Sequence, residues 1–140
     1  MKQLFSERLA AASLLVIFVL ILLFHGLVIT GVIPFGVVWG GRLQTHAQML
    51  AFETVSIALN ALMLAVVAVW AGYWKVSVSS RVLRVALWLM VGLFGLNTVG
   101  NLFSTNVTEK AVFTPLTLLL ALLSLRLALG ARPAPPVAQP

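Results

Sequence analysis

The sequence has 140 residues, of which 61% are hydrophobic and 9% are charged, with a net charge of +6. A soluble domain is excluded, because soluble domains carry about 25% charged residues to hydrate their surfaces. The predicted partner of most of this surface is therefore the lipid bilayer. The basic residues are scattered rather than clustered, so no nucleic-acid partner is predicted. The absence of cysteine excludes disulfides and thiolate metal ligands.

The first apolar run has no charged residue between Leu9 and Gly41. A bilayer core about 30 Å thick takes about 20 helical residues. The run therefore predicts one span over residues 9–33, which ends before Pro34. A signal peptide has an apolar core of only about 7–15 residues, so this first span is predicted to be uncleaved.

The next two apolar runs predict spans over residues 47–74 and 81–103. Thr45, followed three residues later by a glutamine, is typical of a capping box at the start of the second span. Ser79 or Ser80 is expected to cap the third span. Because the connection between these two spans is short, they are predicted to form an antiparallel hairpin.

The fourth span has two candidate starts. Asn106 and Glu109 are spaced as a capping box, which predicts a span over residues 108–129 with Pro115 as a kink inside it. Alternatively, Thr114 is the cap and Pro115 takes the first helical position. The second choice leaves about 16 residues, which is short for a full span, so the earlier start is favoured.

Together these runs predict an all-α fold, a transmembrane four-helix bundle. Residues 1–130 are expected to form a single membrane domain. The last ten residues, 131–140, are rich in proline and alanine, and this composition predicts a disordered cytoplasmic tail.

The distribution of Lys and Arg predicts how the chain is threaded. Seven of these residues lie before or at the start of the first span, around the connection between the second and third spans, or near the end of the fourth span. Only Arg42 and Lys110 lie in the two connections on the opposite side of the membrane. Short loops with such a bias follow the positive-inside rule. Both termini are therefore predicted to be cytoplasmic.

Polar side chains within the spans gather toward the outer side. An ionisable group inside a span is costly, which makes it a candidate functional residue. The outer loop contains two adjacent glycines and is expected to fold back, so that Arg42 meets Glu53. The sequence thus predicts an outward-facing ligand-binding pocket formed by His25, Trp39, Arg42, Glu53, Asn60, Asn97 and Asn101.

Each of these residues also has a purely structural interpretation. Asn97 and Asn101 would be interhelical hydrogen-bond donors, worth about 0.6 kcal/mol per bond. Glu53 would pair with Arg42 only to hold the loop. Trp39 would be an interface anchor, and His25 a helix-contact imidazole rather than a titrating group.

Several chemistries have no support in the sequence. It has no HExxH or comparable metal spacing and no phosphate-binding glycine loop, so neither a metal nor a cofactor is predicted. It also has no aspartate, and its three glutamates are far apart in the sequence. Hydrolysis by paired carboxylates is therefore not expected, which favours a non-enzymatic protein.

A resemblance rests on Pro34, followed after four residues by Trp39-Gly40-Gly41-Arg42-Leu43, on Phe52-Glu53-Thr54, and on Leu96-Asn97-Thr98. With these pieces the chain resembles a group of short bacterial four-span membrane proteins. The resemblance runs from Pro34 through the fourth span and implies a bacterial inner membrane. It implies no activity.

Three functional interpretations remain open. The first is an integral membrane protein that binds a small ligand, a lipid or a partner in the outer pocket. The second is a small transporter or proton-coupled carrier, which would act as a homo-oligomer and use Glu53 and His25. The third is a membrane-embedded enzyme acting on a lipid-like substrate, with Glu53 or His25 as acid or base. The inner half of the spans is almost purely apolar, and this disfavours transport by one chain.

Overall fold

The computed structural model describes residues 6–133. That part of the chain holds four α-helices, each long and apolar enough to cross a membrane. At about 1.5 Å per residue they are each about 35 Å long. Their bounds are α1 (Glu7–Ile29), α2 (His46–Trp70), α3 (Ser80–Leu102) and α4 (Val107–Leu129). The predicted tail lies outside the described residues from residue 134 onward.

The starts of the helices are set by side-chain caps. Thr45 accepts a hydrogen bond from the Gln48 amide, Ser79 from the Val82 amide, and Asn106 from the Glu109 amide, as their residue types predict. The capping boxes are incomplete, which corrects the prediction. The side chain of Gln48 accepts from the Gln44 amide instead, and that of Glu109 accepts from the Ser104 hydroxyl.

Two helices end earlier than the spans predicted from the sequence. α1 stops at Ile29, four residues before the predicted end, and Gly31 follows with a φ of 81°. α2 stops at Trp70, again four residues early, and Gly72 has a φ of 84°. Glycine reaches this left-handed conformation without a steric penalty, so it commonly ends helices. α4 begins one residue before its predicted span and runs through Pro115.

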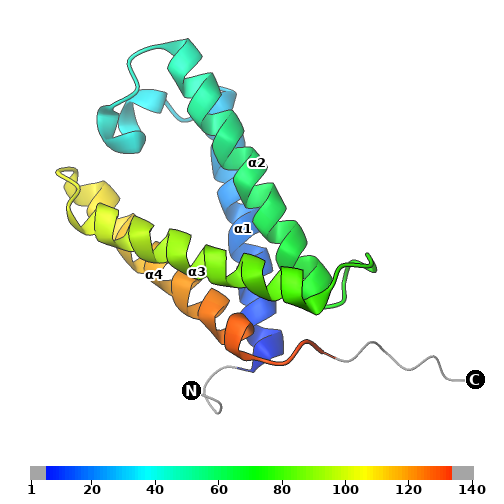
Figure 1. Cartoon of the computed structure of the whole chain (residues 1–140). Coiled ribbons are helices and arrows are strands. Elements are labelled where there is room, and N and C mark those ends of the chain that lie inside the picture. Colours follow the sequence, from blue (N-terminus) through cyan, green and yellow to red (C-terminus); the bar gives the residue numbers. More distant parts are fainter. Residues whose placement is uncertain (1–5, 134–140) are drawn as a thin grey trace, which may run out of the picture.

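The helices form two hairpins, α1–α2 and α3–α4, which meet at one end of the molecule and diverge toward the other (Figure 1). We call these the joined end and the open end. The joined end holds the start of α1, the end of α2, the start of α3 and the end of α4. The open end holds the loop between α1 and α2, residues 30–45, and the turn between α3 and α4.

The main hydrophobic core lies between the hairpins toward the joined end. Every helix contributes fully buried side chains to it, and the rings of Phe18 and Phe94 lie 6.0 Å apart across it. A second, smaller core lies at the open end, where Val38 and Leu43 of the loop pack against Val28 and Met49. The second core fastens the loop to the α1–α2 hairpin, and residues 30–45 thereby become a fixed part of the open end.

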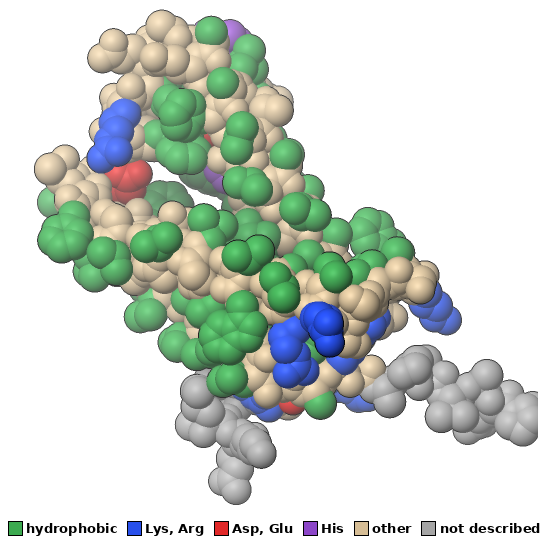
Figure 2. Space-filling model, viewed as in Figure 1, with side chains coloured by type: hydrophobic (Ala, Val, Ile, Leu, Met, Phe, Trp, Pro, Cys, Tyr) green, Lys and Arg blue, Asp and Glu red, His purple; other side chains and the backbone are tan. Residues whose placement is uncertain are grey.

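Polar contacts tie the helix termini together at the joined end. Arg126 pairs with Glu7 at 3.3 Å, and Arg84 donates to the carbonyl of Gly130 at 3.2 Å. Arg132 donates to the carbonyl of Val78 at 3.1 Å. Cations favour the carbonyl-rich C-terminal ends of helices. Basic side chains accordingly gather at this end of the molecule (Figure 2).

Candidate functional site

The most costly buried group in the four apolar helices is Glu53, two turns into α2. Its side chain is 0% exposed. One carboxylate oxygen lies 2.5 Å from Nδ1 of His25 on α1, and the other accepts a hydrogen bond of 2.8 Å from the indole N–H of Trp39. Both oxygens therefore have a partner. The three side chains form what we call the Glu53 cluster, which links α1, the loop and α2.

The Glu53 cluster avoids a lone buried charge. An unpaired carboxylate in a low-dielectric interior costs several kcal/mol. The imidazole of His25 lies against one oxygen of the buried carboxyl group. The indole N–H of Trp39 then satisfies the remaining oxygen. The cluster is thus suited to holding three segments in register.

Trp39 takes a backbone conformation that is rare for its residue type. Its φ is 56°, and Gly40 and Gly41 follow with φ values of 63° and 71°. A bulky residue with positive φ is held there only when its surroundings enforce it. The hydrogen bond to Glu53 and an edge-to-face contact with the ring of Phe52, at 5.2 Å, supply that constraint. The cluster therefore fixes the direction of the Trp39 ring.

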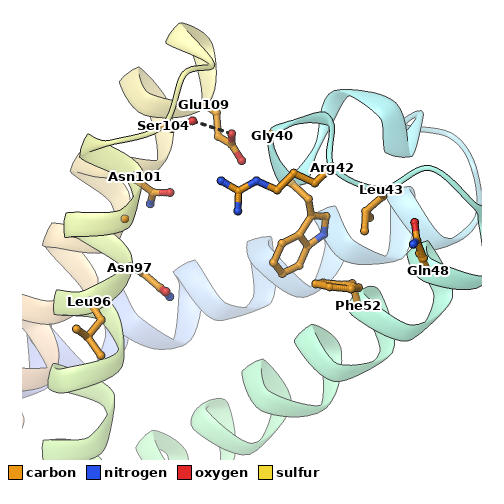
Figure 3. Close-up of a pocket in the computed structure, with 12 residues that line it drawn as sticks. Gly40, Arg42, Leu43, Gln48, Phe52, Leu96, Asn97, Asn101, Ser104 and Glu109 are labelled. Atoms are coloured by element: carbon orange, nitrogen blue, oxygen red, sulfur yellow. Dashed lines mark hydrogen bonds between the residues drawn. The ribbon is translucent and has the colours of Figure 1, made fainter.

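The Trp39 ring forms one wall of a cavity of about 510 Å³ between the two hairpins at the open end (Figure 3). We call it the outer cavity. A hollow between the two hairpins is visible on the surface, and acidic and basic side chains lie at its rim (Figure 2). The lining residues come from the loop, α2, α3 and the start of α4: Trp39, Gly40, Arg42, Leu43, Gln48, Phe52, Leu96, Asn97, Gly100, Asn101, Ser104 and Glu109.

Four of the seven residues proposed from the sequence line this cavity. They are Trp39, Arg42, Asn97 and Asn101. The amide of Asn101 also donates to the Thr117 hydroxyl at 3.4 Å, and Thr98 bonds to Thr117 at 3.0 Å, so this part of α3 is also a hydrogen-bonded helix contact. Asn101 thus makes the predicted interhelical hydrogen bond and also lines the cavity, and its binding of a ligand stays a prediction.

The other three residues do not line the outer cavity. Glu53 and His25 are paired with each other, and Trp39 is the member of their cluster that reaches the cavity. Asn60 lies two turns deeper on α2, where its amide donates to the carbonyl of Ser56 in its own helix. One of its N–H groups is thus bonded within its own helix, away from the lining of the outer cavity.

The expected contact between Arg42 and Glu53 is not formed. Both oxygens of Glu53 are occupied by other partners, and its carboxylate is buried whereas Arg42 is exposed. Arg42 instead extends across the outer cavity toward the side on which Glu109 lies (Figure 3). The imidazole of His25 and the indole of Trp39 are the partners of Glu53, and pairing Glu53 with the Arg nearest in sequence does not anticipate them.

Glu109 is the main site residue that the sequence interpretation missed, because it was considered only as a helix cap. Its Oε2 accepts from the Ser104 hydroxyl at 3.1 Å, and a Cβ added to Gly40 would lie 3.3 Å from the same oxygen. The loop of one hairpin thus touches the first turn of α4 in the other. Asn97 and Asn101 are four residues apart and therefore lie on the same face of α3, the face that lines the cavity.

The fold and the cavity define an all-helical protein with four helices long and apolar enough to cross a membrane and a polar cavity between two helix hairpins. The chain matches no protein-family model, no curated protein and no solved structure in the comparisons made.

Proposed function

We propose that this protein binds an amphiphilic, lipid-like molecule in the outer cavity. The observation that carries the proposal is the mixed lining of a cavity set between membrane-spanning helices. Arg42, Asn97 and Asn101 offer hydrogen bonds, whereas the side chains of Phe52 and Leu96 are apolar and 48% and 73% exposed. A space with both kinds of wall suits a molecule with a polar head and an apolar chain.

A binding role agrees better with the packing than transport or catalysis does. The main core closes the inner part of the space between the hairpins, with Leu14, Leu87 and Phe18 fully buried there. A substrate path through one chain would have to cross that core. Glu53 is the one fully buried acid among the described residues. One of its oxygens is bonded to His25 and the other to Trp39, so neither oxygen is free for a substrate.

Photolabelling of the protein by the surrounding lipids tests the proposal. The protein would be reconstituted in nanodiscs containing phosphatidylethanolamine or phosphatidylglycerol that carries a photoreactive diazirine in the upper acyl chain. We expect labels on Phe52 and Leu96 after irradiation, found by peptide mass spectrometry. Leu62 and Leu89, which are 61% and 69% exposed and do not line the cavity, report labelling by bulk lipid. Labels on Leu62 and Leu89 without any on Phe52 and Leu96 would refute the proposal.

The proposal includes an orientation in a bacterial inner membrane, with both termini cytoplasmic and the outer cavity in the outer leaflet. It is supported by the gathering of basic side chains at the joined end, since basic loops are retained in the cytoplasm. The outer cavity then opens at the level of the outer headgroups. A lipid of that leaflet would reach it sideways between α2 and α3.

Labelling of single introduced cysteines tests this orientation. The natural sequence has no cysteine, so only the introduced residue can react with a maleimide. We expect Gln44→Cys, in the loop at the open end, to react with a membrane-impermeant maleimide added to intact cells. Ser77→Cys, in the exposed connection between α2 and α3, should react only after the membrane is permeabilised. The reverse pattern of labelling would place the outer cavity in the cytoplasmic leaflet and contradict the orientation.

A further inference from the structure

We propose that the amphiphile is zwitterionic and that its headgroup carries a phosphate and a primary ammonium group, as in phosphoethanolamine lipids. The phosphate would bind Arg42 and the ammonium would bind Glu109. This inference rests on the proposed function, because it names the ligand class of the same cavity. It is carried by the two opposite charges of the lining, by the absence of an ion pair between them and by the amides that line the same cavity.

The lining of the outer cavity contains two ionisable side chains, one basic and one acidic. Arg42 reaches into the cavity from the loop, and Glu109 faces it from the first turn of α4 (Figure 3). Among residues 6–133, no ion pair within 4.0 Å joins them. A Cβ added to Gly40 would lie 3.3 Å from Oε2 of Glu109 and 3.8 Å from Nε of Arg42, so the two charged groups flank the same glycine. The cavity therefore presents a cation and an anion that lie near each other without forming an ion pair.

Electrostatic complementarity selects the headgroup. A headgroup with only a negative charge would satisfy Arg42 but would be repelled by Glu109, and a purely cationic one would have the opposite difficulty. A zwitterion satisfies both, and the occupied cavity then remains neutral. The planar guanidinium matches phosphate oxygens in a bidentate manner, which favours phosphate as the anionic part.

The surroundings of Glu109 favour a primary ammonium over a quaternary one. A primary ammonium has three N–H donors, whereas a quaternary ammonium has none and is recognised by cages of aromatic rings. The side chains near Glu109 are polar: the Ser104 hydroxyl bonds to it, and Asn101 lies on the same side of the cavity. Phe52 lies on the opposite side of the cavity (Figure 3), and its ring contacts that of Trp39.

The amides of the lining can complete the recognition. Asn97 and Asn101 from α3 and Gln48 from α2 also line the cavity, and each carries a primary amide. The side-chain oxygen of Gln48 already accepts from the backbone N–H of Gln44, so Gln48 offers only its N–H donors. Asn101 already donates one N–H to Thr117, so its carbonyl oxygen and its second N–H are available to a headgroup. The acyl chains would then follow Phe52 and Leu96 away from the polar groups.

Lipid titrations followed by native mass spectrometry test this assignment. The protein in a maltoside detergent would be titrated with phosphatidylethanolamine, phosphatidylglycerol, phosphatidylcholine and diacylglycerol of identical acyl chains. We expect the apparent Kd for phosphatidylethanolamine to be about tenfold lower than for the other three, since charge-assisted hydrogen bonds are the stronger ones. Water-soluble glycerophosphoethanolamine should not displace it if the ligand is a membrane lipid, and displacement at equal concentration would show that the headgroup alone is recognised.

Variants assign the two halves of the headgroup. Glu109→Gln should remove the preference for phosphatidylethanolamine over phosphatidylglycerol, and Arg42→Gln should weaken both phospholipids about tenfold without changing diacylglycerol binding. Arg42→Lys should restore part of that loss, because it keeps the charge. Lys110→Gln is the matched control, since Lys110 neighbours Glu109, is exposed and does not line the cavity.

Equal affinity for all four lipids in the unaltered protein would overturn the headgroup assignment, as would equal affinity for phosphatidylethanolamine and phosphatidylcholine. In either case photolabels on Phe52 and Leu96 would still leave the proposed function standing. If those labels are also missing, the proposed function fails together with this inference.

Discussion

His25→Leu should lower the free energy of unfolding by about 3 kcal/mol or more, because it leaves the buried carboxyl group of Glu53 without its closest partner. The double variant His25→Leu/Glu53→Leu should lose less than His25→Leu alone. Removing both members leaves no uncompensated acid in the α1–α2 contact, although the Trp39 indole then loses its acceptor. The free energies of unfolding of His25→Leu, Glu53→Leu and the double variant would be measured in bicelles. Unfolding would be driven by dodecyl sulfate and followed by circular dichroism.

The matched control for this prediction is His46→Leu. His46 is the first residue of α2 and is exposed, so its substitution should change the free energy of unfolding by no more than about 0.5 kcal/mol. If the losses from His25→Leu and Glu53→Leu simply add in the double variant, the two side chains do not act as a pair. The Glu53 cluster would then not be what holds the loop in register.

Gly100→Leu should reduce photolabelling of Phe52 and Leu96 about tenfold, because a side chain at this position enters the outer cavity. A Cβ added to Gly100 would meet no heavy atom of the protein within 4 Å. Leucine is also a better helix former than glycine, by about 0.8 kcal/mol. The substitution is therefore expected to fill the cavity without unfolding α3.

Gly92→Leu is the control for Gly100→Leu. Gly92 lies on the same helix, its added Cβ also meets nothing within 4 Å, and it does not line the outer cavity. It should leave labelling of Phe52 and Leu96 unchanged. If Gly100→Leu also leaves both labels at the level of the unaltered protein, the lipid that reaches these residues does not occupy the cavity.

The spans and most of their caps could be predicted because they depend on local sequence. A charge-free run of sufficient length predicts a helix of about 20 residues wherever it occurs, and Thr45, Ser79 and Asn106 satisfy amides only three residues away. The ends of α1 and α2 are less evident from hydropathy, since apolar residues continue beyond Gly31 and Gly72. The left-handed glycines end these two helices, and hydropathy does not detect them.

The partners within the site could not be predicted because they depend on how the segments meet. Arg42 and Glu53 are opposite in charge and close in sequence, which favoured their pairing. In the structure, the left-handed backbone at Trp39 turns the indole toward Glu53, and His25 reaches it from 28 residues away. The role of Glu109 depends on the approach of the loop to α4, which brings two hairpins together and has no local signal.

A structure of the protein determined in a phospholipid nanodisc tests the central claim most directly. The account predicts that the hairpins remain apart at the open end and that elongated density fills the outer cavity. One end of that density should lie between Arg42 and Glu109, and the other should follow Phe52 and Leu96. Hairpins closed on each other, with Phe52 in contact with Leu96 and no space left between them, would contradict it.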